Sequence, residues 1–472
     1  MIGAFDGASI SIREIHRFPN DPVIVNGTIY WDVLRLLHEI KQSIRLAAAA
    51  ADIDSVAIDT WGVDFGALDK NGDLIGNPVH YRDTRTAGIL EKAFEKIERE
   101  ELYKITGIQF LEFNTAFQLL AMKECDPDFP GRIDRILLMP DLFNYFLCGV
   151  KAAEISDAST TQLMDPRDKT WSKVVLDCLG LPPSILPELV KSGTVIGNLS
   201  REVCDELGVP PMKVIAVAGH DTQSAMAAVP AREKDFMFLS CGTWSLLGTE
   251  LDVPLISDKT LSLNITNEIG FGDKISFLKN IAGLWLLQEC RRQWSLKGRE
   301  YSFADLERMA QEASPFVCFV DTDDVAFTLP GNMPKRIREY CLKSGQTVPQ
   351  SEGEIVRCVN ESLAMKYRAT VDMISECTGK RYETIHMLGG GARDGILCQM
   401  TADSCGVPVL AGPVEATVLG NVAAQFIALG EIGNISRARE IIGKLSEIVL
   451  YKPKEADKWE QAYRKFREVV SK

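Results

Sequence analysis

Three short segments combine residue types that can do chemistry with apolar runs that would position them. The segments are Gly219-His220-Asp221-Thr222 after the run 215–218, Ser240-Cys241-Gly242-Thr243 after the run 236–239, and Gly389-Gly390-Gly391 after the run 385–388. A carboxylate can accept the proton of a substrate hydroxyl, whereas glycine turns and hydroxyls bring backbone N–H groups close to phosphate oxygens. These are the parts that phosphoryl transfer needs, because its loose transition state depends mainly on positioning.

The carboxylate at position 221 has two interpretations. Asp221 follows an apolar strand and precedes a small-residue helical stretch, so it is placed either to act as a general base or to cap that helix. The neighbouring His220 is compatible with a half-buried, hydrogen-bonded imidazole. With only five histidines and no pair at i, i+4, the sequence argues against a zinc site.

The two glycine segments are also ambiguous when taken alone. Ser/Gly/Thr turns such as 240–243 are common, and a triple glycine can be a purely structural turn. In the G-x-G-x-x-G frame that starts at Gly389, the last position is Asp394, and no Walker A sequence occurs. An oxidoreductase interpretation would rest on Gly389–Gly391 only, and the missing third glycine counts against it.

A polar and aromatic turn adds a possible sugar-binding surface. Asp59, Trp61, Gly62 and Asp64 place carboxylates beside an indole face, which suits a polyhydroxylated ligand, although tryptophan more commonly packs in a core. The segment 81–85, with two arginines and an aspartate, would line the same cleft or form ion pairs at the surface.

The elements that must position these segments follow from apolar periodicity and turn residues. We expect a hairpin over 2–18, helices over 31–51, 85–102, 117–124, 280–292 and 354–377, and hairpin turns at 71–72 and 240–245. The order strand, glycine turn, helix, strand, helix over 385–429 predicts a mostly parallel sheet covered by helices. The segment 455–470 is expected to form an exposed, charged helix.

Length and composition favour a two-domain α/β protein. The chain has 472 residues, of which 46% are hydrophobic, and the polar segment 230–235 is the expected boundary between domains 1–230 and 231–472. A net charge of -13 disfavours nucleic acid and anionic membranes as partners. Without a signal peptide or an apolar run of about 20 residues, a cytoplasmic location is expected. The twelve scattered cysteines are then reduced thiols, with Cys341 and Cys358 as the alternative disulfide pair.

Considered together, the motifs resemble those of the FGGY-type carbohydrate kinases, which phosphorylate sugars and polyols. The resemblance runs in order over nearly the whole chain, and its motifs are 59–65 (DTWGVDF), 81–86 (YRDTRT), 107–110 (GIQF), 138–141 (LMPD), 219–222 (GHDT), 240–245 (SCGTWS), 283–288 (GLWLLQ), 412–416 (GPVEA) and 420–421 (GN). It implies an α/β architecture of two ribonuclease-H-like domains with the actin-like, hexokinase-like ATPase fold and an interdomain cleft.

The resemblance also implies a reaction and a set of roles. The N-terminal domain would bind the sugar and the C-terminal domain the nucleotide, with the last helix packing back on the first domain. ATP and Mg²⁺ would serve transfer to the 1-hydroxyl of a ketose such as L-rhamnulose. Asp221 would be the catalytic base, the sugar would be bound by Gly62, His220, Asp221, Thr222 and Asn280, and ATP by Thr243, Gln288, Gly390 and Gly391. The metal ligands and the oligomeric state are not implied.

One departure from the family pattern lies at the start of the chain. Family members begin with a strand that carries an acidic residue and a phosphate-binding Gly/Ser/Arg turn, whereas Asp6–Ser9 corresponds to the hairpin turn that follows. We expect about 15 residues to be missing, and a chain extended upstream to bind ATP and turn over better. The alternatives are a kinase for L-fuculose, ribulose, xylulose or glycerol, and a catalytically silent sugar-binding relative.

Overall fold

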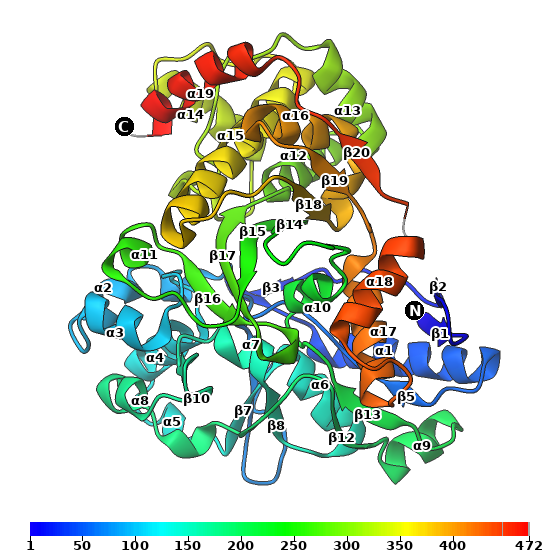
Figure 1. Ribbon diagram of the computed structural model, residues 1–472. Helices are drawn as coiled ribbons and strands as arrows, with labels where there is room; N and C mark the ends of the chain where they lie inside the picture. Colours follow the sequence, from blue (N-terminus) through cyan, green and yellow to red (C-terminus); the bar gives the residue numbers. More distant parts are fainter. Residues whose placement is uncertain (446, 471–472) are drawn as a thin grey trace. The chain divides into compact units, whose positions relative to one another are not determined.

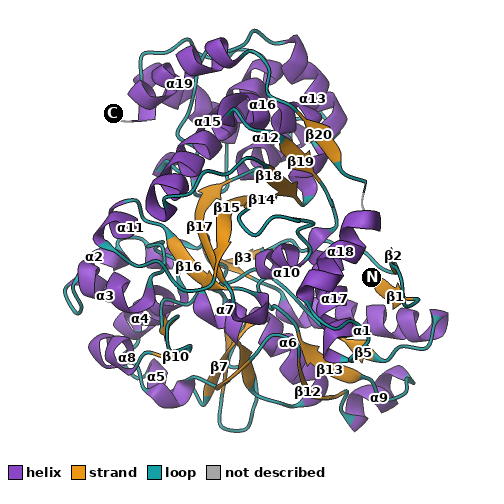
Figure 2. Cartoon of the chain, in the orientation of Figure 1, coloured by secondary structure: helices purple, strands orange, loops and turns teal. Residues whose placement is uncertain are grey.

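The computed structural model describes residues 1–445 and 447–470, and Figure 2 shows their mixed helix and strand composition. The chain forms two compact units. The first comprises 1–228, 251–277 and 417–445, and the second comprises 229–250, 278–416 and 446–472. Two later segments of the chain, 251–277 and 417–445, thus group with the first unit.

The first unit contains many short strands and most of the helices. Its strands are β1 (Ile2–Phe5), β2 (Ile10–Arg13), β3 (Val23–Val25), β4 (Thr28–Tyr30), β5 (Ser55–Val56), β6 (Phe65–Leu68), β7 (Arg135–Leu138), β8 (Ala152–Glu154), β9 (Met164–Asp165), β10 (Thr170–Trp171), β11 (Glu188–Val190), β12 (Thr194–Asn198), β13 (Lys213–Ala216) and β16 (Thr266–Ile269). Its helices are α1 (Val33–Ala50), α2 (Ile89–Phe94), α3 (Arg99–Thr106), α4 (Thr115–Cys125), α5 (Phe129–Arg132), α6 (Met139–Cys148), α7 (Ile155–Ser159), α8 (Lys173–Leu179), α9 (Arg201–Leu207), α10 (Asp221–Ala227), α11 (Asp258–Ser262), α17 (Ala416–Ala428) and α18 (Ile435–Leu445).

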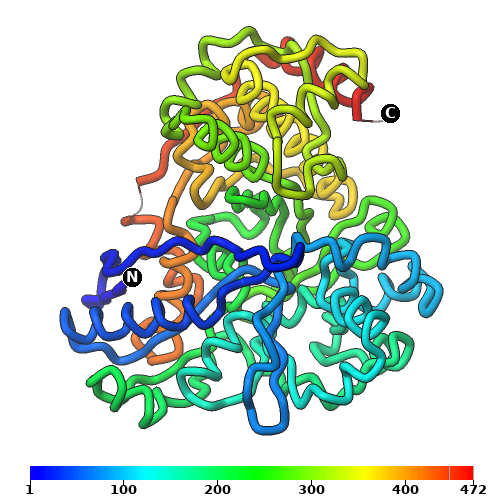
Figure 3. The backbone as a smooth tube through the Cα atoms, turned by 180° about the vertical axis from the view of Figure 1, so that it is seen from behind, coloured from blue at the N-terminus to red at the C-terminus, as the bar shows by residue number. Residues whose placement is uncertain are grey.

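Strand β13 is the element that delivers the first candidate segment. It lies in the centre of a sheet of order β12-β13-β5, parallel to β5 and antiparallel to β12. Its residues Val214 and Ile215 are fully buried, as their apolar character predicts. The N-terminal hairpin β1–β2 forms a separate two-stranded sheet, and Figure 3 shows it beside α17 and α18, where Phe5 contacts Phe426.

Specific contacts explain why the two later segments belong to the first unit. Leu261, Ile269 and Ile275 enter the same hydrophobic core as helices α2–α4. In α17 the helix backbone approaches α10 so closely that a Cβ on Gly420 would lie 1.7 Å from the Ser224 carbonyl oxygen. Only glycine permits that approach, so α17 is packed directly against the helix that begins at Asp221.

The second unit is built on six strands of a seven-stranded sheet with the order β16-β17-β15-β14-β18-β19-β20 (Figure 1). Its strands are β14 (Met237–Cys241), β15 (Trp244–Leu251), β17 (Ile275–Ala282), β18 (Ile385–Leu388), β19 (Val409–Ala411) and β20 (Val449–Tyr451), and its helices are α12 (Trp285–Ser295), α13 (Phe303–Glu312), α14 (Met333–Lys343), α15 (Glu352–Thr378), α16 (Gly395–Cys405) and α19 (Ala456–Val470). Strand β14 is antiparallel to β15 and parallel to β18, and β18 is parallel to β19, so the predicted parallel pairing over 385–411 is confirmed. The carboxyl ends of β14 and β18 therefore meet at one edge.

Some expected elements differ in the structure. The segment 280–292 is not one helix, because residues 280–282 complete β17 and α12 begins at Trp285. The last helix, α19, lies in the second unit and packs on α15 and α16, where Trp459 and Phe466 are buried. Its strong amphipathic pattern of charged and apolar positions explains this, since a buried stripe underlies the charged face. No helix in the described residues is long and apolar enough to cross a membrane.

Candidate active site

In the first unit, the candidate site lies between the end of β13 and the start of α10. His220 is the N-cap residue of α10 and Asp221 is its first residue. The Asp221 backbone N–H donates to the Thr60 carbonyl at 2.7 Å, and the Thr60 N–H donates to the Gly219 carbonyl at 2.9 Å. These bonds join the 219–222 segment to the turn that carries Trp61 and Gly62, although the two are about 160 residues apart.

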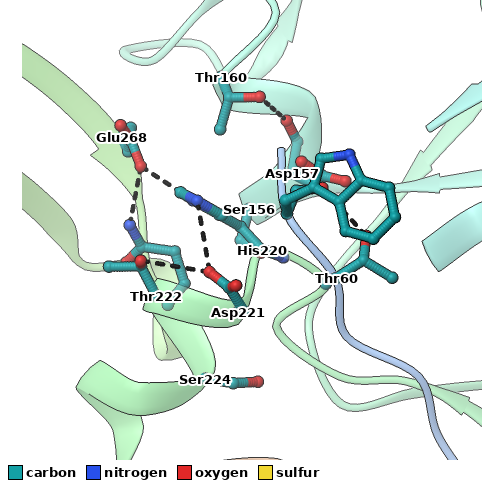
Figure 4. Close-up of polar contacts among 12 residues, drawn as sticks. Thr60, Ser156, Asp157, Thr160, His220, Asp221, Thr222, Ser224 and Glu268 are labelled. Atoms are coloured by element: carbon teal, nitrogen blue, oxygen red, sulfur yellow. Dashed lines mark hydrogen bonds and ion pairs between the residues drawn. The ribbon is translucent and has the colours of Figure 1, made fainter. Parts of the chain in front are cut away.

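A buried ion pair fixes the charge of His220. Its Nδ1 lies 3.1 Å from Glu268 Oε2 on β16, and its Nε2 lies 3.8 Å from Asp221 Oδ1 (Figure 4). Burial alone would lower the pKa of His220, but the close carboxylate of Glu268, together with Asp221 and Asp157, outweighs it and raises the pKa to about 9. The imidazole is therefore positively charged at neutral pH.

Asp221 is placed to meet a ligand. Its side chain is 47% exposed, whereas that of His220 beside it is only 11% exposed. Partial desolvation raises the pKa of the Asp221 carboxyl, and the charge of His220 and hydrogen bonds from Thr222 act against that rise. The Thr222 hydroxyl donates to Asp221 Oδ1 at 3.3 Å. Asp221 is the first residue of α10, and the N-cap residue before it, His220, makes no side-chain cap hydrogen bond.

A second carboxyl lies near the first. Asp59 Oδ2 accepts a 2.5 Å hydrogen bond from the Asn421 amide on α17. Burial raises the pKa of Asp59 to about 7, with a further contribution from the negative charge of Asp221. Repulsion of this kind between two carboxylates is relieved when a cation binds near them.

Asp157 on α7 is the least compensated polar group of this region. Within the described residues, neither of its carboxylate oxygens has a hydrogen-bond partner, and its side chain has no exposed surface. Burial is the main reason that its pKa is raised well above the ordinary value. A Cβ on Gly62 would lie 3.1 Å from Asp157 Oδ1, so the absence of a side chain at position 62 leaves room next to this carboxyl. Orphaned buried acceptors of this kind are typical of ligand sites.

Glu154 fixes the start of α7 and the 219–222 segment relative to each other. Its Oε2 accepts hydrogen bonds from the backbone N–H of Gly219 at 2.8 Å and of Ser156 at 3.0 Å, and so caps α7 while fixing the 219–222 segment. The carboxyl is almost fully buried and is satisfied by these donors. Positions 157 and 220 are thereby held by one anchoring side chain.

The aromatic turn has a mainly structural role. Asp64 accepts hydrogen bonds from the indole N–H groups of Trp31 at 2.6 Å and Trp61 at 3.1 Å, and the two rings pack with centroids 4.0 Å apart. Val63, which precedes Asp64 in the sequence, has φ of 67°, a strained value for a β-branched residue. Its carbonyl accepts from the Thr115 hydroxyl at 2.7 Å, which helps to hold the strained turn beside Gly62. In the segment 81–85, Arg82 and Asp83 are buried, whereas Thr84 is exposed.

In the second unit, the turn between β14 and β15 forms the other candidate segment. The Thr243 hydroxyl donates to the Gln288 side-chain oxygen on α12 at 3.1 Å. The backbone N–H groups of Leu284 and Trp285 donate to the carbonyls of Gly242 and Thr243 at 2.9 and 3.2 Å. The start of α12 is therefore hydrogen-bonded to the β14–β15 turn. These bonds bring together Thr243 and Gln288, the two residues that the family resemblance assigned to ATP.

The triple glycine lies directly against the same turn. A Cβ on Gly391 would lie 2.2 Å from Cys241 Sγ. Gly389 has φ of +79°, and a Cβ there would lie 3.1 Å from the carbonyl oxygen of Cys241. Gly390, by contrast, is exposed and faces open space. Glycine is required at 389 and 391 by backbone packing, and at 390 it leaves bare backbone accessible to a flat ligand. Asp394 caps α16 by accepting from the Leu397 N–H at 2.9 Å.

The structure thus forms two clusters of the predicted residues, one in each unit. Gly62, His220, Asp221 and Thr222 lie together in the first unit, and Thr243, Gln288, Gly390 and Gly391 lie together in the second. Asn280 lies on β17, half-buried, in the second unit. Sequence reasoning missed Glu268, Asp157 and Glu154. The polar run 156–162 inside an otherwise apolar region could have drawn attention to Asp157 and to Glu154 just before it. The sequence around Glu268 contains no comparable signal.

Comparisons with known proteins identify the class. Residues 14–228 match the N-terminal domain, and residues 237–429 the C-terminal domain, of the FGGY family of carbohydrate kinases. The chain belongs to this family, and the resemblance drawn from its motifs is confirmed. It is a sugar kinase, and kinases of this family use ATP together with a divalent metal.

Individual relatives and solved structures agree with this class. A protein named rhamnulokinase from Bacteroides thetaiotaomicron is 40% identical over 471 residues, covering 100% of this chain and 96% of its own length. A rhamnulokinase from Halalkalibacterium halodurans is 42% identical over 92% of both chains. The ligand-bound xylulose kinase from Lactobacillus acidophilus superposes with a TM-score of 0.79 at 16% identity, covering 96% of this chain and 91% of that one. Plasmodium falciparum glycerol kinase with ADP gives 0.75 at 15% identity, covering 98% and 96%. The predicted actin-like, hexokinase-like α/β fold is therefore confirmed.

Proposed function

We propose that this kinase transfers the terminal phosphoryl group of ATP to the 1-hydroxyl of L-rhamnulose, giving L-rhamnulose 1-phosphate and ADP. Relatives named rhamnulokinase, with identities of 40% and 42%, support this substrate over other ketoses. The observation that carries the chemistry is the half-exposed Asp221 carboxylate held beside a positively charged His220. Such a product belongs to the breakdown of L-rhamnose, in the cytoplasm of the cell.

In the proposed mechanism the first unit binds and activates the sugar. Asp221 accepts the proton of the 1-hydroxyl as that oxygen attacks, and its raised pKa makes it a better base than an ordinary aspartate. The charged His220 donates a hydrogen bond to a sugar oxygen or keeps Asp221 ionised until the sugar arrives. Thr222 and the bare backbone at Gly62 complete the contacts of the first unit, and Asn280 of the second unit adds an amide.

The second unit supplies the contacts for ATP. The Thr243 hydroxyl and the backbone of its turn are suited to phosphate oxygens, and the amide of Gln288 steadies that hydroxyl. The flat base or the ribose would lie against the exposed backbone of Gly390, next to Gly391, which is buried against Cys241.

A divalent cation such as Mg²⁺ fits the carboxyl pair of the first unit. Asp59 and Asp221 offer the hard oxygen ligands that Mg²⁺ prefers. Burial is the main cause of the raised pKa of Asp59, and the smaller contribution from the charge of Asp221 would be relieved by the ion. When bound, such an ion neutralises charge on the transferred phosphoryl group. We propose these two side chains as its protein contacts.

The test is a panel of ketoses and glycerol assayed with ATP by coupled ADP release. L-rhamnulose is expected to give the highest kcat/KM, exceeding L-fuculose, ribulose and xylulose. Asp221→Asn is expected to lower kcat by roughly 100-fold or more while sugar affinity is largely kept, as loss of a general base does. Asp52→Asn, at an exposed aspartate of the same unit, is the matched control.

Each other outcome has a definite meaning. A higher kcat/KM for a different sugar would identify that sugar, and not L-rhamnulose, as the substrate. Absence of ADP release with every sugar, despite measurable sugar binding, would show a catalytically silent relative. Loss of sugar affinity with normal kcat in Asp221→Asn would assign that side chain to binding instead of proton transfer.

A further inference from the structure

A buried tyrosine hydroxyl lies at the base of the β14–β15 turn in the second unit. Tyr367, in the middle of α15, has a fully buried side chain, and its hydroxyl oxygen lies 2.7 Å from Ser245 Oγ and 3.7 Å from Cys241 Sγ. Cys241 and Ser245 are also fully buried, and they face each other as the pair that closes the turn. The residues between them, 242–244, are half-exposed. The turn therefore has an accessible tip and a base that is hydrogen-bonded to α15.

Two glycine segments are packed against the same closing pair. A Cβ on Gly283, just before α12, would lie 2.5 Å from Ser245 Oγ, and a Cβ on Gly391 would lie 2.2 Å from Cys241 Sγ. Contacts this close leave neither side chain room to move without displacing the neighbouring backbone. The two side chains that are hydrogen-bonded to Tyr367 thus set the distances between the turn, the start of α12 and the triple glycine.

The three side chains of this set are uncharged. Burial raises the pKa of the Tyr367 hydroxyl well above its ordinary value and that of the Cys241 thiol to about 11, so both keep their protons at neutral pH. The Ser245 hydroxyl also lies 3.7 Å from Cys241 Sγ, which closes the set of hydrogen bonds. A buried tyrosine hydroxyl ordinarily finds some partner in a core, but here both partners are the residues that close one turn.

From these contacts we propose that the Tyr367 hydroxyl positions the β14–β15 turn for the phosphate groups of ATP. The inference rests on the proposed assignment of Thr243 and its turn to the nucleotide. A turn binds phosphate well when its hydroxyl and backbone N–H groups are held in place before the ligand arrives. Tyr367 acts through Ser245 and Cys241, because its own side chain has no exposed surface with which to touch a ligand. Loss of the hydroxyl therefore weakens nucleotide binding and leaves sugar binding unchanged.

The experiment compares Tyr367→Phe with the wild-type protein as full-length chains. ADP with Mg²⁺ is titrated by calorimetry, and KM is measured separately for ATP and for the sugar. Loss of one hydrogen bond is expected to raise the dissociation constant of ADP and the KM for ATP about 5-fold, with the KM for the sugar unchanged. A purely structural loss would not separate the two substrates in this way.

Tyr382→Phe is the matched control. It removes another buried tyrosine hydroxyl of the second unit, which is hydrogen-bonded to Thr378 Oγ1 at 3.2 Å, and it is expected to bind ADP like wild type. Ser245→Ala removes the hydrogen bond to Tyr367 from the other side, and it decides the question if Tyr367→Phe does not fold. When both substitutions are combined, the dissociation constant of ADP should rise by less than the product of their separate effects.

The outcomes separate this inference from the function on which it rests. Wild-type affinity for ADP in Tyr367→Phe, or in Ser245→Ala where only that variant folds, would overturn the positioning role if Thr243→Ala binds ADP more weakly. An equal loss of affinity in Tyr382→Phe, or an equal rise in the KM for the sugar, would also overturn it. Wild-type affinity for ADP in Thr243→Ala would instead refute the assignment of the turn to ATP.

Discussion

Replacing Glu268 with glutamine removes the charge that keeps His220 protonated. Glu268 is 3% exposed, and its Oε2 lies 3.1 Å from His220 Nδ1. Glutamine keeps the size of the side chain and its contact with Gln223, but it carries no charge. The pKa of His220 should therefore fall, because burial continues to disfavour the charged imidazole.

The magnitude follows from the pKa of the folded protein. A rise from 6.5 to about 9 corresponds to roughly 3 kcal/mol of preferential stabilisation of the charged imidazole. Because the pKa is raised in the folded state, this contribution is fully present below about pH 6.5 and is lost as the pH rises through about 9. Glu268→Gln is expected to lower the pKa by at least about 1 unit, or about 1.4 kcal/mol, since Asp221 and Asp157 still act.

The assay is an NMR titration of the imidazole signals of ¹³C-labelled histidine. The chain has only five histidines, so the His220 signal can be assigned with His220→Gln. Wild type should titrate well above the ordinary range, Glu268→Gln clearly lower, and Glu188→Gln, at an exposed glutamate on β11, like wild type. An imidazole that titrates near 6.5 in wild type and does not respond to Glu268→Gln would refute the ion-pair reasoning.

Three further predictions concern the close contacts of the two clusters. Asp157→Asn should raise KM for the sugar about 10-fold with little change in kcat if this orphaned carboxyl receives a substrate hydroxyl; unchanged steady-state kinetics would assign it a structural role. Gly62→Ala should likewise raise the sugar KM, because the new Cβ would lie 3.1 Å from Asp157 Oδ1, and direct sugar-binding calorimetry would show it. Gly391→Ala should cost about 1–3 kcal/mol of unfolding free energy, because its Cβ would meet Cys241 Sγ at 2.2 Å. A double-mutant cycle with Cys241→Gly should recover part of that loss, and strict additivity would contradict the steric explanation.

Much of the fold could be predicted because the decisive signals are local. The helix at 352–378 begins with a capping box formed by Ser351 and Glu354 and ends at Gly379 with φ of +67°, and these residues, with its apolar positions, can be recognised in sequence. The helix predicted over 280–292 was wrong at its start because the local pattern there conflicts with a non-local interaction. Residues 280–282 are apolar or amide and fit a helical period, but pairing in the sheet, a non-local interaction, holds them in β17.

The candidate site was predictable only as far as its residues lie in recognisable turns. Asp221, Thr243 and the glycines follow apolar strands, so their positions at strand ends could be inferred. Glu268, which sets the charge of His220, lies 48 residues downstream in an ordinary strand and reaches the imidazole only because the segment 251–277 packs into the first unit. Its packing depends on contacts such as the 2.6 Å bond from the Tyr103 hydroxyl to the Ile265 carbonyl. The residue that controls the charge beside the proposed base is thus fixed by tertiary structure, and a local pattern carries no information about it.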